Sequence, residues 1–389
     1  MPDTRTDYHR GRIPSKGKGA GRKQKPNGIN AIGYISLQAG LAKACRDNIS
    51  AFRYHFEVAE NDFPPCLESG INAPFAFNYH HWHPDHVGDD LEKICNSPLF
   101  TDHRVNVAFW AWEVQGYVKP TWVKASRHFN QVWCPSRYTR DQLAPHLDTE
   151  VQAVPHYVHA PRFKRKDRSD RKKGFTILTA FDGKSRLDRK NPAGAIAAFK
   201  TAFPRGEDVR LVMKCHGLTP QFEREMNAMI DGDPRIKLLI GYMTDFEVID
   251  LYDSVDCFLS LHKAEGFGLH LAEAMAHSVP VVATGFSGNL DFMNEANSLL
   301  VDYRMTDVQD TYYQFGKWAD PRVDDAADKL RELWEKFGST STKKIIENAY
   351  ATISSQFSFY NTANTLHALM AKAANVRKFS PGKSKGPQE

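Results

Sequence analysis

Residues 258–284, FLSLHKAEGFGLHLAEAMAHSVPVVAT, decide the fold of this chain. The apolar run that ends near Leu261 is typical of a buried strand, and residues 269–277 have the pattern of a helix. A short loop that contains Gly266 and Gly268 joins the two. A strand, a glycine loop and a helix in this order predict a doubly wound α/β domain, whose ligands bind at the carboxyl ends of the strands.

The same stretch contains two acidic residues that the predicted structure directs to one pocket. Glu265 lies in the loop, and Glu273 lies about one turn into the helix. The amides at the helix start, with the helix dipole behind them, favour a phosphate or an oxygen that gains negative charge. The two carboxylates could hold hydroxyl groups of two parts of one ligand. The alternative is a surface loop in which Glu265 and Glu273 only complement the dipole of the helix, since the same spacing between them would then be found.

Strand-like and helix-like segments alternate on both sides of a charged stretch at 162–174. Before it we expect strands at 31–35, 75–79, 105–110 and 131–134 and helices at 40–52, 121–129 and 137–143. After it we expect strands at 175–180, 209–214, 236–240, 255–261 and 279–284 and helices at 193–203, 221–230, 244–252 and 269–277. Thr244 and Glu247 have the form of a capping box. The alternation predicts two Rossmann-like domains, 28–161 and 175–358, with 162–174 as the linker.

The positive charge of the chain is concentrated at its two ends. The formal net charge is +5 over 389 residues, a length that allows two or three domains. Residues 1–27 carry eight basic and two acidic side chains, residues 376–389 carry four and one, and the body between them is left with −4. Both ends are expected to be disordered basic tails because they offer little apolar surface to bury. We therefore expect no nucleic-acid partner.

The cysteines and the hydropathy indicate a cytoplasmic protein. Six cysteines, at positions 45, 66, 95, 134, 215 and 257, are scattered without a CxxC pair, which is typical of reduced thiols. No apolar run approaches the length of a membrane span, and the N-terminus lacks the apolar core of a signal peptide. A disulfide scaffold and a zinc ribbon are therefore not expected.

The segment EGFGLHLAE (265–273) resembles the E-x7-E motif of the family-four, or group 1, retaining glycosyltransferases. FDGKSRLDRKNPAGAIAAF (181–199) is similar to the donor-diphosphate segment of the branch that carries Arg-Lys-Asn-Pro. Further similar stretches extend the resemblance over residues 28–360; they are 30–46, 109–113, 132–143, 153–159, 284–293 and 317–330. The resemblance implies the GT-B fold, with an acceptor domain and a donor domain that face a central cleft, and a crossover helix at 359–375.

The resemblance also implies roles for individual residues. Glu265 would contact the donor sugar, and Glu273 would hydrogen-bond the ribose hydroxyls. Arg189 and Lys190 would neutralise the diphosphate as the glycosidic bond breaks, because such groups stabilise leaving-group charge. The loop amides would contact the sugar or the phosphates; they are those of Gly266, Phe267, Gly268 and Leu269.

The chain departs from the family pattern at the cations. Many relatives have Gly-Arg where Lys184 and Ser185 stand, so the second cation could be Lys184 instead of Arg189. Lys214, at the end of a predicted strand, is a further candidate. Gly40 matches the glycine that lets the N-terminal domain approach the reacting group, although a plain turn glycine would look the same.

Two clusters in the first half could also take part in chemistry. In NYHHWHPDH (78–86), four histidines beside Asp85 could bind zinc or iron, could place one histidine at the cleft, or could be solvated loop residues. His83 is our candidate for a catalytic residue at the cleft. Trp112 and Glu113 follow a predicted strand and are candidate acceptor contacts, although the aromatic residue could instead be core.

We therefore expect a metal-independent enzyme without a cofactor. It would transfer a sugar from a nucleotide diphosphate sugar to a hydroxyl of a glycan or lipid-linked glycan, with retention, in glycan or polysaccharide biosynthesis. The basic tails could contact anionic lipid at the inner face of a membrane. The alternatives are a non-catalytic nucleotide-sugar-binding module, a GT-B sugar-nucleotide epimerase, and a metal-dependent hydrolase built on His80–His86.

Overall fold

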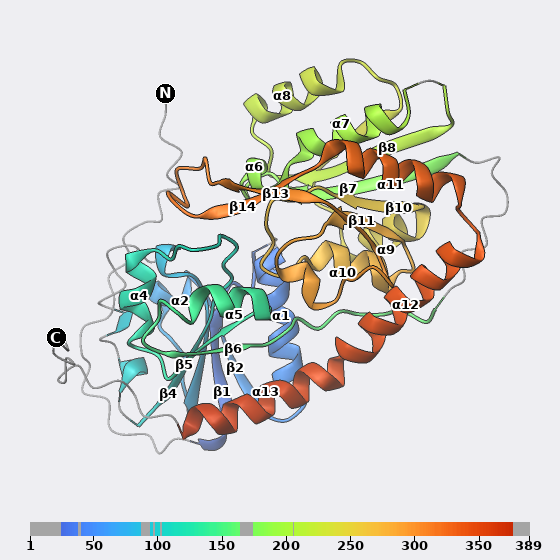
Figure 1. The fold of residues 1–389 in the computed structure, drawn as a ribbon. Coiled ribbons are helices and arrows are strands. Elements are labelled where there is room, and N and C mark those ends of the chain that lie inside the picture. Colours follow the sequence, from blue (N-terminus) through green and yellow to red (C-terminus); the bar gives the residue numbers. More distant parts are fainter. Residues whose placement is uncertain are drawn as a thin grey trace, which may run out of the picture.

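Two parallel six-stranded sheets form the framework of the protein (Figure 1). The structure is a computed structural model that describes residues 25–37, 40–86, 94–95, 98–101, 103–163, 174–204 and 206–375. The segments 162–174 and 376–389, expected to be a linker and a tail, lie largely or wholly outside these ranges. None of the described helices is long and apolar enough to span a membrane.

The first sheet has the strand order β2-β1-β3-β4-β5-β6. Its strands are β1 (Lys25–Gly33), β2 (Glu57–Asp62), β3 (Phe75–His81), β4 (Val105–Phe109), β5 (Gln131–Cys134) and β6 (Glu150–Ala153). The helical elements around it are α1 (Gly40–Phe52), α2 (Cys66–Ser69), η1 (Pro84–His86), η3 (Pro98–Phe100), α4 (Pro120–Ser126) and α5 (Arg137–Leu143). The central strands β3, β4 and β5 are almost wholly buried because helices cover both faces of the sheet.

The second sheet has the order β12-β11-β10-β7-β8-β9. Its strands are β7 (Phe175–Asp182), β8 (Val209–His216), β9 (Ile236–Ile240), β10 (Cys257–Ser260), β11 (Val281–Thr284) and β12 (Leu299–Val301). Its helices are α6 (Leu187–Lys190), α7 (Pro192–Ala202), α8 (Pro220–Ile230), α9 (Asp245–Ser254), α10 (Leu269–Ala276), η5 (Gly288–Asp291), α11 (Val323–Glu335) and α12 (Thr340–Gln356). The capping box of Thr244 and Glu247 is present at the start of α9.

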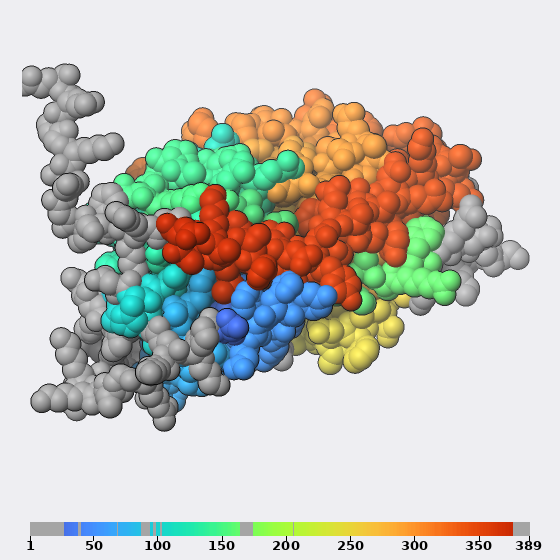
Figure 2. All heavy atoms as spheres, turned by 90° about the horizontal axis from the view of Figure 1, so that it is seen from below, coloured from blue at the N-terminus to red at the C-terminus, as the bar shows by residue number. Residues whose placement is uncertain are grey.

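Two further elements connect the domains. β13 (Tyr303–Asp307) and β14 (Lys317–Pro321) pair as an antiparallel hairpin. α13 (Phe359–Ala374) returns to the first domain and packs on α1. In Figure 2, α12 and α13 run in red along one face of the molecule as far as the blue N-terminal segment. The two six-stranded parallel sheets, tied by a returning helix, confirm the expected α/β fold of two doubly wound domains.

The structure adds strands that the sequence pattern did not predict. β2 and β6 are the two edge strands of the first sheet, so neither shows a long apolar run. β1 begins at Lys25, which pairs with Phe75, and ends at Gly33. The expected tail boundary at residue 27 and the expected strand at 31–35 are therefore displaced, because strand pairing uses backbone groups and does not require apolar side chains.

Candidate active site

A cavity of about 980 Å³ lies between the two domains, at the carboxyl ends of strands from both sheets. Its N-terminal wall includes Gly40, Lys43, His83, Glu113 and His156. Its C-terminal wall is formed by the glycine loop and by side chains around it; the candidates among them are Lys190, Lys214, Glu265, Gly266, Phe267, Gly268, Leu269 and Glu273. The structure thus brings most of the candidate residues together.

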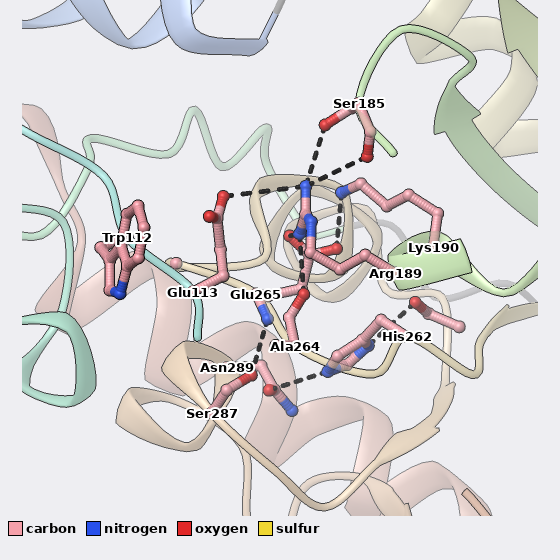
Figure 3. A network of polar contacts seen from close by, with 12 residues as sticks. Trp112, Glu113, Ser185, Arg189, Lys190, His262, Ala264, Glu265, Ser287 and Asn289 are labelled. Carbon is pink, nitrogen blue, oxygen red and sulfur yellow. Dashed lines mark hydrogen bonds and ion pairs between the residues drawn. The ribbon is translucent and has the colours of Figure 1, made fainter. Parts of the chain in front are cut away.

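Glu265 is the centre of the charged cluster in this cavity (Figure 3). Lys190 Nζ donates to Glu265 Oε1 at 2.6 Å, and Arg189 Nη1 donates to Oε2 at 3.2 Å. Burial alone would raise the pKa of this carboxyl, but the charges of Lys190 and Arg189 outweigh it and lower the pKa well below its usual range. Glu265 is therefore an ionised carboxylate in a site largely shielded from water.

The glycine loop has a conformation that other residues would not adopt without strain. Gly268, the residue before α10, has a φ of +93°. Gly288 packs so closely that an added Cβ would lie 2.3 Å from the carbonyl oxygen of Gly266. On the other side, Thr139 Oγ1 of the first domain donates to this carbonyl at 3.2 Å. The loop is therefore held by both domains while its amide-bearing end faces the cavity.

The structure separates the four candidate cations into two groups. Lys190 and Lys214 line the cavity, and burial lowers the pKa of Lys214. Arg189 is 3% exposed and lies behind Glu265, where Nη1 also donates to the carbonyl oxygen of Ala264 at 2.7 Å. Lys184 is exposed and does not line the cavity. Lys190 and Lys214 therefore face the cavity, whereas Arg189 and Lys184 do not.

Glu273 faces the cavity from α10 and is held from both domains. Tyr252 donates from its hydroxyl to Oε2 at 3.1 Å, and His270 Nδ1 lies 3.3 Å from the same oxygen. Lys43 Nζ, on α1, lies 3.7 Å from Oε1. Burial would raise the pKa of Glu273, but His270 and Lys43 lower it. Lys43 was not among the predicted site residues, although its position one turn after Gly40 signals a place at the cavity.

Gly40 begins α1 and lines the cavity. An added Cβ at Gly40 would meet no described atom within 4 Å, so the space beside it is open to a ligand.

The histidine segment separates into buried strand residues and one residue at the cavity. His80 and His81 are buried in β3, whereas His83 lines the cavity. Burial lowers the pKa of His83 to about 3, so its ring is neutral, and Nε2 accepts from the amide of Ala111 at 3.3 Å. Among the described residues, no three histidine, cysteine or acidic side chains are placed to hold a metal ion. The hypothesis of a metal site in this segment therefore gains no support.

Trp112 and Glu113 have different environments although they are adjacent. Trp112 is 1% exposed, and its Nε1 donates to the carbonyl oxygen of Tyr117 at 2.8 Å. The expectation that Trp112 contacts an acceptor is therefore wrong: the indole is core, because it packs against Trp122 and Tyr313. Glu113 does line the cavity, with Oε1 3.7 Å from Arg189 Nη2.

Residues 181–312 match the profile of a family described as glycosyl transferases group 1. No curated protein matches the chain in sequence. The matched residues include Lys190, Lys214, Glu265 and Glu273, and exclude the whole first domain.

Solved structures show the same fold at low identity. HepE of Anabaena, in complex with UDP-glucose, is 15% identical with a TM-score of 0.65, over 89% of this chain and 100% of HepE. A glycosyltransferase of Rickettsia africae is 15% identical with a TM-score of 0.62, over 90% of this chain and 99% of that protein. TarM of S. aureus is 13% identical with a TM-score of 0.58 over 77% of this chain, which spans about half (55%) of TarM. The fold is therefore GT-B.

Proposed function

We propose that this protein is a glycosyltransferase that moves a sugar from a nucleotide diphosphate sugar to an acceptor hydroxyl. The observation that carries the proposal is the contact between Lys190 and Glu265 beside the glycine loop, in a cavity between two Rossmann-like domains. The group 1 match over 181–312 supports it, as do neighbours of the same fold whose structures contain UDP or UDP-glucose.

The cavity can be divided between the parts of such a donor. We propose that Glu273 binds the ribose hydroxyls, because its carboxylate faces the cavity from the first turns of α10. The diphosphate would lie between Lys190, Lys214 and the amides at the start of α10. The sugar would lie against Glu265, with the neutral ring of His83 on the opposite wall.

The proposed reaction proceeds with retention at the anomeric carbon. The bond between this carbon and the phosphate oxygen breaks, the acceptor oxygen bonds to the same face, and the departing phosphate oxygen takes the acceptor proton. Lys190 and Lys214 would stabilise the charge that grows on the leaving group. The protein would otherwise act by aligning the two substrates. Neither a metal ion nor a cofactor is part of this proposal.

Two further parts of the proposal concern the setting of the reaction. We propose that the acceptor is a glycan or a lipid-linked glycan in glycan or polysaccharide biosynthesis, because the E-x7-E segment resembles enzymes of that kind. We also propose a cytoplasmic enzyme whose basic tails contact anionic lipid, because the tails carry net charges of +6 and +3 on a body of −4.

The variants Glu265→Gln and Lys190→Ala test the assignment. Glu265→Gln removes the carboxylate charge but keeps the shape of the side chain, and Lys190→Ala removes a cation from the diphosphate site. We expect each to lower kcat at least about a hundred-fold, since each removes charge stabilisation at the reacting centre. The measurement is release of nucleotide and formation of a glycoside from a panel of nucleotide sugars, with thermal stabilisation by each nucleotide as a binding readout.

Lys184→Ala is the matched control, because Lys184 is a nearby lysine that does not line the cavity. Its activity should equal that of the unmodified protein. Full activity in both site variants would overturn the assignment. Binding of a nucleotide sugar without turnover would indicate a binding module, and an altered sugar that is not transferred would indicate an epimerase.

A further inference from the structure

The hairpin of β13 and β14 crosses from the second domain to the first. Its neighbours in the chain, β12 and α11, belong to the second domain, yet Tyr313 and Trp318 are buried in the apolar core that contains Trp112 and Trp122. Figure 1 shows the hairpin above α4 and α5, whereas α12 and α13 run along the other side of the molecule. The hairpin thus forms an interdomain contact separate from the returning helix.

Backbone contacts fix the place where the hairpin meets the first domain. The amide of Gln115 donates to the carbonyl oxygen of Lys317 at 3.0 Å, and the amide of Lys317 donates to Gln115 at 2.9 Å. Gly316, with a φ of +105°, precedes this bridge, and an added Cβ there would lie 2.2 Å from Val114 Cγ1. The tip of the hairpin is therefore docked in one defined register.

This docking places a hydroxyl group directly behind Glu113. Tyr313 Oη donates to Glu113 Oε2 at 3.1 Å, and the ring of Tyr313 is 3% exposed. The other carboxylate oxygen, Oε1, lies 3.7 Å from Arg189 Nη2. Arg189 is itself held by Ser185 Oγ, which accepts from Nη2 at 2.9 Å. Tyr313 and Arg189 do not line the cavity, whereas Glu113 does.

We propose that Tyr313 is a positioning residue that orients Glu113 to accept a hydrogen bond from a hydroxyl of the acceptor other than the one that reacts. The proposal rests on the glycosyl transfer proposed above. A carboxylate oxygen can accept two hydrogen bonds, so Oε1 keeps capacity for a ligand beside Arg189. Tyr313 occupies Oε2 and sets the rotation of the carboxylate. Because Glu113 belongs to the first domain, which is the proposed acceptor domain, we expect the acceptor to depend on this orientation more than the donor does.

The neighbouring Tyr312 provides a comparison within the same hairpin. Its hydroxyl donates to Asp85 Oδ2 at 3.0 Å, and its ring lies under Lys119 Nζ at 3.3 Å. Asp85 and Lys119 do not line the cavity. Tyr312 and Tyr313 therefore both fasten the hairpin through a hydroxyl and a carboxylate, but only the carboxylate of Glu113 faces the site.

The experiment compares Tyr313→Phe with Tyr312→Phe, which delete the same group from adjacent rings. Kinetics use UDP-glucose as the donor probe and octyl β-D-glucoside as the acceptor probe. In Tyr313→Phe, we expect KM for the glucoside to rise roughly ten-fold, the size expected for one hydrogen bond to a charged group, with KM for UDP-glucose unchanged. Tyr312→Phe should leave both values unchanged. Equal effects of the two substitutions, or a parallel loss of donor affinity, would show that Tyr313 only fastens the hairpin.

Crystal structures of the two variants give a readout that does not require turnover. The proposal predicts that Glu113 rotates away from Arg189 in Tyr313→Phe and stays in place in Tyr312→Phe. An unmoved Glu113 in Tyr313→Phe would overturn it. If the unmodified protein turned over no nucleotide sugar at all, the proposed glycosyl transfer would fail, and the position of Glu113 would still decide the role of Tyr313.

Discussion

At the scale of single residues, the site combines buried charges with buried neutral rings. Glu265 and Arg189 are ionised because each lies beside an opposite charge, whereas His83 and His156 are neutral because burial disfavours the imidazolium. His156 is 7% exposed, and its ring contacts Phe267 of the glycine loop across the domain boundary. The folded protein therefore resists protonation at this position.

The pH dependence of stability should report on His156. Burial lowers its pKa to about 3, while an unfolded chain has a histidine pKa of about 6.5. Between these values the unfolded state binds the proton and the folded state does not, so stability is lost as pH falls below about 6.5. The loss attributable to this group is about 1.4 kcal/mol per pH unit. Urea unfolding between pH 7.5 and 5 measures it.

Two glutamine variants separate this contribution from the rest. His156→Gln should reduce the slope of unfolding free energy against pH by the share of one group, while other buried histidines such as His83 keep the rest. His146→Gln, at an exposed histidine, is the control. If unfolding free energy has the same slope against pH in the unmodified protein and in His156→Gln, His156 binds its proton equally well in the folded and the unfolded state.

The sequence predicted the positions of site residues best where one short segment carries them. Glu265, Glu273 and the loop between them follow one strand, so their common cavity follows from the parallel sheet. The family resemblance suggested that Arg189 lies at the diphosphate, and the charge pattern alone does not distinguish a cation that faces a ligand from one that supports a carboxylate. Glu113 and Tyr313 are 200 positions apart, and no local pattern predicts their hydrogen bond.

At the scale of elements, the hairpin is one of the parts of the fold that periodicity did not predict, as are β2, β6 and β12. The helices expected at 40–52 and 137–143 have the bounds found in the structure, because amphipathic spacing and caps define helices locally. The crossover helix that the resemblance implied at 359–375 ends one residue earlier, at Ala374. β13 and β14 instead depend on a tip that docks against another domain. That contact depends on a close approach at Gly316. In the sequence its only signal is this one glycine, which looks like any other.

The substitution Gly316→Ala should detach the hairpin tip. Its Cβ would collide with Val114 and would strain a residue at positive φ, at a cost on the order of 2–3 kcal/mol in unfolding free energy. Hydrogen exchange measured by mass spectrometry should show lost protection at the amides of Gln115 and Lys317.

Gly338→Ala is the matched control, since Gly338 has a φ of +84° with no described atom within 4 Å of an added Cβ. It carries the backbone strain without the collision and should keep both amides protected. Protection retained in Gly316→Ala would mean that the hairpin does not depend on this close approach.

At the scale of the whole molecule, the net positive charge lies at the two ends of the chain and not in the body that forms the two domains. The body of the chain, residues 28–375, carries a net charge of −4, whereas the ends carry the positive charge. Since β1 begins at Lys25, a truncation that spares the first sheet has to stop at residue 24.

Removal of residues 1–24 and 376–389 tests the proposed membrane contact. We expect the truncated protein to keep its thermal stability and its turnover, and to lose flotation with vesicles that contain phosphatidylserine, because each basic residue near an anionic surface contributes about 1 kcal/mol. Binding of the full chain should also weaken as salt rises. Phosphatidylcholine vesicles are the control. Equal flotation of the two proteins would show that the tails do not bind lipid.

The returning helix α13 has a consequence for the order in which the protein folds. Ala363, Leu366 and Ala373 lie in the same apolar core as β1 and β3, although more than 280 residues of chain separate them from those strands. During synthesis the first domain emerges long before this helix does, and domains otherwise tend to fold in the order of their emergence. The domain that is made first therefore completes its core last, and until then it exposes an apolar surface beside α1 that a chaperone could cover.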